Sequence, residues 1–296
     1  MVLLMQGSQK LMDVNQLEEF NLEKCHQYGE GASSIVYTIN DEPNIILKLF
    51  NLSVSRDAIQ EEYIQSIKML ELGLPTPEAY KMVRVGEQIG IIYRRITNKI
   101  SFSKALAKDF DNAEALMKQF AELCQNMHNT KANTSYFKDQ ALFYDSLIDK
   151  CQQLDTQDKL KAHKLLASIE KKDTVLHGDM HTGNVVLENG KPYWIDLGAI
   201  SYGNPMFDVS TLYFLFFECA DLPFVQENFH LNAIQLRTCW KLFAKYYAGI
   251  NSEEELNKYN NMLRPISIFF NIFGFVVLGF AFPEDIKRVK NILANI

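Results

Sequence analysis

The sequence lacks several features that would each assign a protein to a class. Lysines and arginines form no cluster, which argues against a nucleic-acid partner. The N-terminus has no basic region followed by a long apolar core, so no secretory signal is predicted. The sequence contains no C-x-x-C pair, so no zinc site is indicated. The odd number of widely spaced cysteines fits reduced thiols in the cytoplasm. The five cysteines are Cys25, Cys124, Cys151, Cys219 and Cys239.

Long hydrophobic runs are also scarce. The longest uncharged apolar stretch, ISIFFNIFGFVVLGFAF, has 17 residues at 266–282 and is bracketed by Pro265 and Pro283. A spanning helix needs about 20 such residues, and this stretch includes Asn271 and two glycines. We expect a buried core helix and no membrane association, with a membrane or partner surface as the alternative.

The composition is that of an ordinary globular protein. The chain has 296 residues, of which 47% are hydrophobic and 22% charged, with a formal net charge of −6. This length suffices for one large domain or for two lobes with a sizeable core. The acidic balance suits a cationic small substrate better than an anionic one.

The period of the hydrophobic pattern changes near residue 97. Residues 1–20 form a lead-in, and residues 21–96 are strand-rich. Within them SIVYTI and IILKLF form a predicted hairpin with its turn at Asp41–Asn44, and one helix is expected at 53–72. Residues 97–296 are mainly helical, with helices expected at 103–130, 139–171, 207–220, 232–249, 253–263 and 265–281. We therefore predict an α+β fold, with a small antiparallel β-sheet lobe containing one helix and a larger helical lobe.

One polar loop, HGDMHTGN at 177–184, lies between two apolar runs. Asp179 and Asn184 are five residues apart, and their oxygens are able to face one small volume that holds a reacting hydroxyl and a hard cation. The alternative is an ordinary polar turn, because Gly178, Gly183 and Asn184 all favour turns.

Two features of the strand-rich part point to phosphate binding. The segment YGEGASSIVY has the pattern G-x-G-x-x-S-x-V, and glycines there let backbone N–H groups approach phosphate oxygens. Lys48 interrupts the apolar strand IILKLF, and a buried ammonium needs a partner. The alternatives are an ordinary hairpin for the first feature and an edge strand with Lys48 in solvent for the second.

Two carboxylates complete the set. Helical periodicity in 53–72 puts Glu62 beside the apolar face and Glu61 closer to solvent, so we favour Glu62 as the partner of Lys48. Asp196 follows an apolar strand and precedes Gly198, 12 residues after Asn184. Together with Asn184 it offers the oxygen ligands that Mg²⁺ prefers.

In this order, the motifs resemble the protein-kinase-like fold, and HGDMHTGN followed by WIDLGAISYGNPMFD resembles its aminoglycoside phosphotransferase and choline kinase branch. The segments GLPTP at 73–77 and GIIYRRI at 90–96 resemble a bacterial subgroup of aminoglycoside or choline kinases. The resemblance covers roughly residues 25–285 and implies a two-lobed enzyme that uses ATP and Mg²⁺. Two departures are Ser34, in place of a third glycine, and Arg94, in place of an acidic residue.

The resemblance also implies a role for each matching residue. Asp179 would accept or orient the proton of the acceptor hydroxyl, and Asn184 and Asp196 would hold Mg²⁺. Lys48, paired with Glu62, would hold the α and β phosphates. The remaining roles concern the phosphate-covering loop (Gly29, Gly31, Ser33 and Ser34), the backbone at the adenine edge (Arg94 to Ile96) and the support of the catalytic loop (His177 and Asp208).

The acceptor is expected to be a small hydroxylated molecule. Only nine steps separate Asp196 from Pro205, which leaves no room for the platform that binds a peptide in protein kinases. An amine-bearing acceptor is suggested by the acidic balance, and Glu218, Asp221 and Glu227 are candidates for lining its pocket. The alternatives are a non-catalytic nucleotide-binding module and a protein-modifying kinase.

Overall fold

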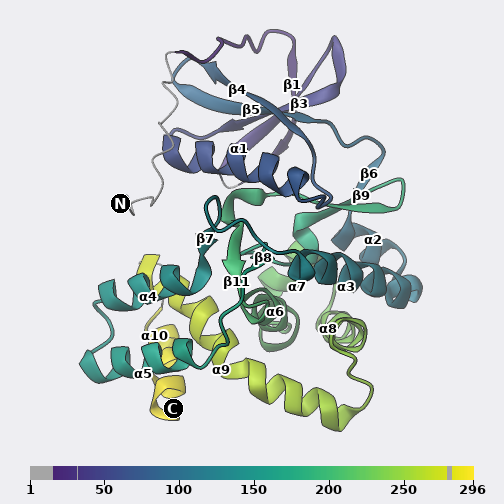
Figure 1. The fold of residues 1–296 in the computed structure, drawn as a ribbon. Helices are drawn as coiled ribbons and strands as arrows, with labels where there is room; N and C mark the ends of the chain where they lie inside the picture. Colours follow the sequence, from purple (N-terminus) through teal and green to yellow (C-terminus); the bar gives the residue numbers. More distant parts are fainter. Residues whose placement is uncertain (1–15, 32, 279–281) are drawn as a thin grey trace. The chain divides into compact units, whose positions relative to one another are not determined.

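A computed structural model describes residues 16–31, 33–278 and 282–296 (Figure 1). The chain divides into two compact units: Met1–Ile100 with Val186–Ala199, and Ser101–Val185 with Ile200–Ile296. We call them unit 1 and unit 2. The segment Val186–Ala199, which follows the polar loop, groups with the N-terminal residues, whereas the sequence boundary near 97 leaves it with the helical part.

Hydrogen bonds explain why this segment belongs to unit 1. The Trp194 N–H donates to the Pro75 carbonyl at 2.8 Å. Arg94 donates to both carboxylate oxygens of Glu188, at 3.2 and 3.0 Å, and the Thr97 N–H donates to Glu188 at 2.8 Å. These are long-range contacts, and the period of a hydrophobic pattern carries no information about them.

Unit 1 is built on a five-stranded antiparallel sheet with the order β1-β2-β3-β5-β4. Helix α1 (Arg56–Glu71) lies along one face (Figure 1), and the Ser55 hydroxyl caps it by accepting from the Ala58 N–H at 3.2 Å. A smaller sheet has the order β10-β9-β6. The strands are β1 (Cys25–Glu30), β2 (Ser34–Ile39), β3 (Glu42–Phe50), β4 (Ala79–Val85), β5 (Gln88–Arg94), β6 (Lys99–Ser101), β9 (Val185–Glu188) and β10 (Lys191–Trp194).

The two faces of the larger sheet bury different hydrophobic clusters. The face toward α1 includes Phe50, Ile91 and Tyr93, packed against Ile59 of the helix, and the opposite face includes Leu47 and Leu49 among others. Side chains alternate along a strand. Lys48 therefore lies on the same face of β3 as Phe50, toward α1.

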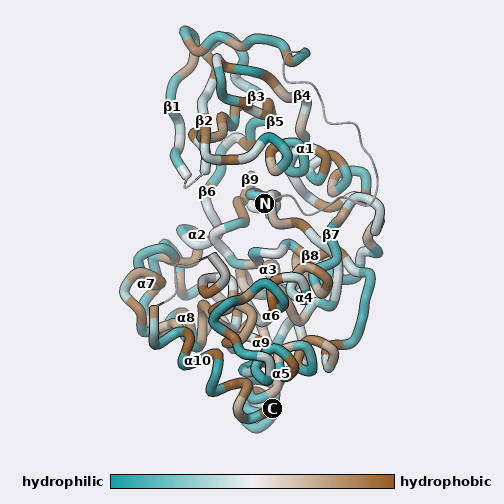
Figure 2. Tube along the Cα trace, turned by 90° about the vertical axis from the view of Figure 1, so that its left-hand side faces the viewer, coloured by the Kyte–Doolittle hydropathy of each residue, from teal (hydrophilic) through white to brown (hydrophobic). Residues whose placement is uncertain are grey.

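Unit 2 is mainly helical, with a small sheet of order β7-β11-β8. Its strands are β7 (Lys138–Asp139), β8 (Thr174–Leu176) and β11 (Ser201–Gly203). Its helices are α2 (Phe102–Lys108), α3 (Ala113–Asn129), α4 (Gln140–Lys150), α5 (Thr156–Ala167), α6 (Met206–Tyr213), α7 (Pro223–Phe229), α8 (Ala233–Ala248), α9 (Glu253–Leu278) and α10 (Pro283–Ala294), with short turns η2 (Phe110–Asn112), η3 (Thr182–Asn184) and η4 (Leu197–Ala199, in unit 1) and a π-helical turn η5 (Phe214–Glu218). Hydrophobic residues recur along the central strands and the helices (Figure 2).

The predicted α+β fold class is confirmed.

Helix α9 corrects one prediction. Two helices meeting at Pro265 were expected, but one continuous helix of 26 residues includes this proline. Pro265 removes one backbone donor from the helix, and the buried row that follows, with Phe269 and Phe273 both at 0% exposure, keeps the helix packed past it. The second half of α9 is thus the core helix that the apolar stretch predicts, and residues 279–281 of that stretch lie outside the described residues.

Other boundaries differ in smaller ways. Strand β3 begins at Glu42, so the hairpin turn is shorter than predicted, and the short helix α7 was not predicted. The lead-in lies outside the described residues up to residue 15. In the portion of the chain that the structure describes, every helix is too short or too polar to cross a membrane.

A glycine in the middle of β5 gives a test of this packing. A Cβ at Gly90 would lie 2.5 Å from Leu47 Cδ1 and 3.1 Å from the Lys48 carbonyl oxygen. Gly90→Ala should lower the free energy of unfolding by ~1–3 kcal/mol, the usual cost of overpacking. Denaturant titration measures it. Gly29→Ala is the control, because nothing lies within 4 Å of its Cβ position, and equal losses in both variants would contradict the close packing of β3 on β5.

Candidate active site

The clearest polar feature inside unit 1 is an ion pair under the sheet. The Lys48 ammonium donates to Glu62 Oε1 at 2.7 Å, and the two side chains are only 14% and 7% exposed. Glu62, and not Glu61, is thus the partner, as helical periodicity favours. Burial by itself lowers the pKa of Lys48, but the carboxylates of Glu62 and Asp196 outweigh it and hold this pKa above its usual value. The ammonium therefore stays charged inside an apolar unit.

Two uncharged residues, Tyr93 and Gly198, lie against the Glu62 carboxylate. The Tyr93 hydroxyl donates to Glu62 Oε1 at 3.1 Å, and burial together with Glu62 raises the pKa of Tyr93 well above its usual value. On the other side, a Cβ at Gly198 would lie 3.3 Å from Glu62 Oε2. The glycine of the D-L-G sequence thus lets the backbone after Asp196 pass close to this carboxylate.

Asp196 adds a second carboxylate to the ammonium. Its Oδ1 lies 3.3 Å from Lys48 Nζ, and its side chain remains 60% exposed. Its φ is +59°, a left-handed conformation that costs free energy for a residue with a side chain. Strain of this kind is typical of functional sites. The exposed carboxylate is positioned to bind a further cation or a donor from a ligand.

The segment YGEGASSIVY connects β1 to β2 and forms a β-hairpin, which is the ordinary alternative that the sequence left open. Gly29 lies in β1, the Gly31 N–H donates to the Ser34 carbonyl at 2.9 Å, and the Asn51 N–H donates to the Ser33 carbonyl at 2.9 Å. Ser34 is buried at the start of β2 while Ser33 is exposed. Among the described residues, nothing lies within 4 Å of a Cβ placed at Gly29.

The segment after β5 leaves one backbone donor available. The Arg94 N–H donates to the Glu78 carbonyl at 2.8 Å, and the Arg95 N–H donates to the Asn44 carbonyl at 2.7 Å. The Ile96 N–H finds no acceptor among the residues that the structure describes, although Ile96 is only 6% exposed. A buried backbone donor normally has a partner, so a ligand edge with an acceptor atom would satisfy it.

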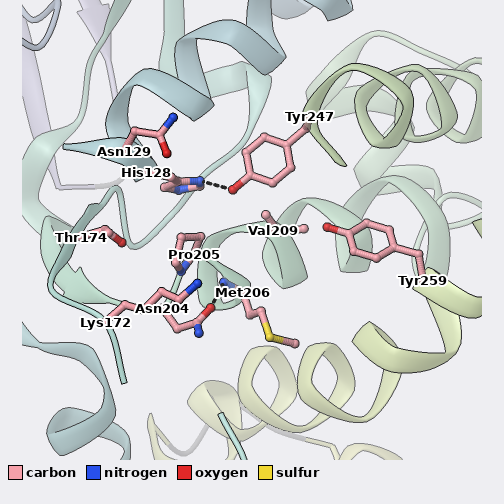
Figure 3. Close-up of a pocket in the computed structure, with 10 residues that line it drawn as sticks. All are labelled: His128, Asn129, Lys172, Thr174, Asn204, Pro205, Met206, Val209, Tyr247 and Tyr259. Atoms are coloured by element: carbon pink, nitrogen blue, oxygen red, sulfur yellow. Dashed lines mark hydrogen bonds between the residues drawn. The ribbon is translucent and has the colours of Figure 1, made fainter. Parts of the chain in front are cut away.

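In unit 2, the polar loop is anchored by a buried carboxylate. Asp208, 1% exposed, accepts from the backbone N–H groups of His177 at 2.6 Å and Gly178 at 2.9 Å. His128 Nε2 lies 3.1 Å from Asp208 Oδ2, and His128 Nδ1 lies 2.7 Å from the Tyr247 hydroxyl (Figure 3). The carboxylate accepts only, so Nε2 must carry a proton. A hydrogen-bonded chain thus connects α8 to the backbone just before Asp179.

His128 and Tyr247 also line a cavity of about 470 Å³ on this side of the loop (Figure 3). Neither residue was singled out from the sequence, because a histidine on the buried face of a helix is most often a core residue. The role of His128 in holding Asp208 becomes visible only in the structure, where α3, α6 and α8 bring His128, Asp208 and Tyr247 together.

Asp179 is oriented by two neighbours within the loop. Asn184 Nδ2 donates to Asp179 Oδ2 at 3.0 Å and to its carbonyl oxygen at 2.8 Å. The Gly183 N–H donates to His181 Nδ1 at 3.0 Å, so the proton of a neutral His181 sits on Nε2, which lies 3.4 Å from Asp179 Oδ2. His181 is a second residue that sequence reasoning missed. Its position two residues after Asp179 was the available signal.

The pKa of Asp179 follows from these contacts. Burial by itself raises it, but the hydrogen bond from His181, the electrostatic influence of His181 and His177, and the hydrogen bond from the Asn184 amide lower it to about 2. The carboxylate is therefore ionised at neutral pH and is available to accept a hydrogen bond from a hydroxyl.

The amide of Asn184 has one unused atom. Its nitrogen is turned toward Asp179, and its Oδ1 accepts no hydrogen bond among the described residues. An amide oxygen held in this way is a suitable ligand for a hard cation. The described residues include no group of three His, Cys, Asp or Glu side chains placed to hold a metal ion.

A cavity of about 350 Å³ in unit 2 is lined by Asp179, His181, Gly183, Leu215, Phe224, Val225, Asn228 and Phe229. The carboxylates proposed from the sequence as lining residues are not among them. Glu218 accepts from the Tyr213 hydroxyl at 2.7 Å and pairs with Arg264, Asp221 pairs with Arg237, and Glu227 is exposed. Glu218 and Asp221 are thus paired with arginines that lie far from them in the sequence, which sequence position alone does not show.

The buried ion pair predicts a large difference between two neighbouring glutamates. Glu62→Gln leaves the Lys48 ammonium without its closest charge partner, and removal of one partner of a buried pair costs ~3–5 kcal/mol of folding free energy. Glu61→Gln should cost under about 1 kcal/mol. Urea denaturation of both variants measures this, and equal stabilities would mean that the pair contributes nothing.

The contacts of Asp179 predict a change in acid stability. A lowered pKa stabilises the fold above about pH 4, and this contribution is lost as the pH falls toward about 2. His181→Ala should raise the pKa of Asp179 toward 3.8 and make that loss smaller. The ¹³Cγ shift of Asp179 in the metal-free protein reports the pKa. His163→Ala, which removes a contact with Asp145 at 2.8 Å, should leave it unchanged; an unaltered Asp179 pKa in His181→Ala would contradict the assignment.

Comparisons with known proteins agree with this fold. The structure resembles a thermostable mutant of the aminoglycoside phosphotransferase APH(4)-Ia in complex with ADP and hygromycin B (14% identity, TM-score 0.62, covering 92% of this chain and 94% of that one). It also resembles a choline/ethanolamine kinase family protein from Mesorhizobium loti (10%, 0.53, 92% and 86%) and APH(2'')-IIa in its streptomycin–ATP complex (15%, 0.55, 92% and 91%). At these identities the likeness concerns the fold.

The sequence itself carries the family assignment. Residues 24–243, which include the ion pair of unit 1 and the anchored loop of unit 2, match the model of the phosphotransferase enzyme family known as APH. This range covers more than half of the chain, and it confirms the resemblance seen in the motifs. The protein belongs to the APH phosphotransferase enzyme family.

Proposed function

We propose that the protein transfers the γ-phosphoryl group of ATP to a hydroxyl of a small molecule such as an aminoglycoside, choline or a similar amino alcohol. The observation that carries the proposal is the charged Lys48 ammonium, held under an apolar sheet by Glu62 at 2.7 Å and Asp196 at 3.3 Å. A cation kept charged in this way is suited to the phosphates of a nucleotide.

The nucleotide would contact unit 1 at three places. Lys48 binds the α and β phosphates, and the hairpin turn with Gly29, Gly31, Ser33 and Ser34 covers them. The Ile96 N–H meets an acceptor atom of the adenine ring, next to Arg94. Its lack of an acceptor in the described residues supports this role.

Asp179 would act on the acceptor. Phosphoryl transfer needs in-line placement and charge neutralisation more than covalent help. The ionised Asp179 accepts the hydrogen bond of the acceptor hydroxyl and takes its proton as the oxygen bonds to the γ-phosphorus and ADP leaves. His181 and Asn184 hold the carboxylate in position, and Asp208 fixes the backbone that carries it, supported by the buried His177.

We propose that Asn184 and Asp196 each offer an oxygen donor to a magnesium ion. The Asn184 amide oxygen and the exposed Asp196 carboxylate are hard oxygen donors, and one or two protein ligands combined with substrate phosphates are typical of Mg²⁺. When bound, Mg²⁺ neutralises charge on the phosphates. The chain then supplies orientation, because Asn184 is locked by its bonds to Asp179 at 2.8 and 3.0 Å.

Two aspartate variants test the assignment. Asp196→Ala should lose most Mg²⁺-dependent ATP affinity, whereas Asp179→Asn should keep the affinity and lose turnover by about 10²–10⁴-fold, the usual contribution of a positioned base. Calorimetry measures the affinity, and ADP release with a panel of aminoglycosides and amino alcohols measures turnover. Asp221→Asn, which changes an exposed carboxylate paired with Arg237, is the control and should alter neither.

Three results would contradict the proposal. Equal losses of ATP affinity in Asp196→Ala and Asp179→Asn would show that the roles are misassigned. Failure of ATP with Mg²⁺ to stabilise the wild-type protein would remove the nucleotide, because a ligand at 100 times its dissociation constant adds about 2.7 kcal/mol. ATP binding without phosphorylation of any hydroxyl compound would favour a non-catalytic module.

A further inference from the structure

The backbone of unit 1 is held on both sides of Ile96. The N–H groups of Arg94 and Arg95 donate to backbone carbonyl oxygens at 2.8 and 2.7 Å. The Thr97 N–H donates to Oε1 of Glu188 at 2.8 Å. Of these four consecutive N–H groups, only that of Ile96 has no acceptor among the residues that the structure describes. Ile96 therefore presents a lone donor within a fixed stretch of backbone.

Glu188, the last residue of β9, is the side chain that holds this stretch. Its carboxylate accepts from Arg94 Nη1 at 3.2 and 3.0 Å, and it accepts from the Thr97 N–H at 2.8 Å and the Thr97 hydroxyl at 3.4 Å. One carboxylate thus receives donors from residues on both sides of Ile96. We call Arg94, Thr97 and Glu188 the Glu188 clamp.

The Glu188 clamp is shielded from water and charged. The side chains of Glu188 and Arg94 are 13% and 30% exposed, and the Arg94 guanidinium carbon lies 5.1 Å from the centroid of the Tyr193 ring. Burial by itself raises the pKa of Glu188, but the hydrogen bonds from Thr97 and Arg94 outweigh it and hold this pKa below its usual value. Hydrogen bonds to an ionised group are roughly twice as strong as neutral ones, so the clamp limits the movement of the backbone.

A fixed backbone donor selects a base by the atom that it meets. Adenine presents a ring nitrogen, N1, that accepts a hydrogen bond, whereas guanine carries a proton on the same nitrogen. The neighbouring O6 of guanine is an acceptor, but its use requires a shift of the base or of the backbone. A buried donor left without an acceptor is costly, so a site built around one rejects a ligand that lacks the matching atom.

We infer that Glu188 is a positioning residue for the nucleotide base, and that the Glu188 clamp gives the protein a preference for ATP over GTP. The inference rests on the proposed function, since it concerns the nucleotide of the same site. Glu188 acts through Arg94 and Thr97, which keep the Ile96 N–H directed at an acceptor atom of adenine.

Calorimetry of the full-length protein with ATP and with GTP, each with Mg²⁺, tests the inference. The wild-type protein should bind ATP about tenfold more tightly than GTP, or better. Glu188→Ala should raise the dissociation constant for ATP by about tenfold, the effect of losing one well-placed hydrogen bond. It should leave the dissociation constant for GTP unchanged, because guanine has no acceptor at the matching atom. A purely structural role would weaken both nucleotides alike.

A conservative variant covers the case in which Glu188→Ala does not fold. Glu188→Gln keeps an amide oxygen for the Thr97 N–H and loses the ion pair with Arg94, so its preference for ATP should fall between those of the wild type and Glu188→Ala. Thermal denaturation followed by circular dichroism shows which variants are folded. An ATP preference that Glu188→Gln leaves at the wild-type value would overturn the inference.

Glu19→Ala is the matched control. Glu19 also belongs to unit 1, pairs with an arginine (Arg84, at 2.5 Å) and accepts a backbone N–H (that of Gly86, at 3.0 Å), but it lies beside β4. It should change neither dissociation constant. The inference is overturned if the wild type binds GTP as tightly as ATP, or if Glu188→Ala weakens the two nucleotides by the same factor or leaves both unchanged.

ADP release with the panel of aminoglycosides and amino alcohols distinguishes this inference from the proposed function. A preference for ATP that is lost in Glu188→Ala, without ADP release for any acceptor, would support the clamp and count against phosphoryl transfer. Phosphorylation of an acceptor by the wild type with equal kcat/KM for ATP and GTP would support phosphoryl transfer and count against the clamp.

Discussion

The ion pair between Lys48 and Glu62 is the constraint on which unit 1 depends. An ammonium that is only 14% exposed has to be matched by a carboxylate, and this requirement fixes the position of α1 against β3. The Tyr93 hydroxyl donates a hydrogen bond to Glu62. Gly198 has no side chain, so its backbone passes close to the same carboxylate. The pair connects helix, sheet and the Asp196 segment in one polar cluster, with Asp196 as its exposed member.

Unit 2 depends on a buried carboxylate that binds backbone N–H groups and not an ammonium. Asp208 is buried and accepts three donors, two of them backbone N–H groups of the polar loop. Its carboxylate holds the backbone of His177 and Gly178. Asp179, the next residue in the loop, is contacted by Asn184 and His181 at Oδ2. The two aspartates differ in burial and partners, although the residue type is the same: Asp208 is 1% exposed, and the side chain of Asp179 is 51% exposed.

The residues that line the cavity beside Asp179 differ from what the acidic composition suggests. A net charge of −6 favours a cationic acceptor, but the acidic side chains of the segment 218–227 are bound by arginines or exposed, and aromatic side chains line the cavity. Charge counted over a whole chain describes its average surface. The chemistry of this cavity depends on the eight residues that line it.

The sequence by itself determined the fold class, the family, the helical face that carries Glu62 and the alternation that turns Lys48 toward α1. All of these follow from local periodicity or from motifs of fixed spacing. Only the tertiary structure decided that Val186–Ala199 belongs to unit 1, that α9 continues through Pro265, that His128 supports Asp208, and that no glutamate or aspartate other than Asp179 lines the cavity. These features depend on contacts between residues far apart in the chain, where packing and pairing outweigh local preference.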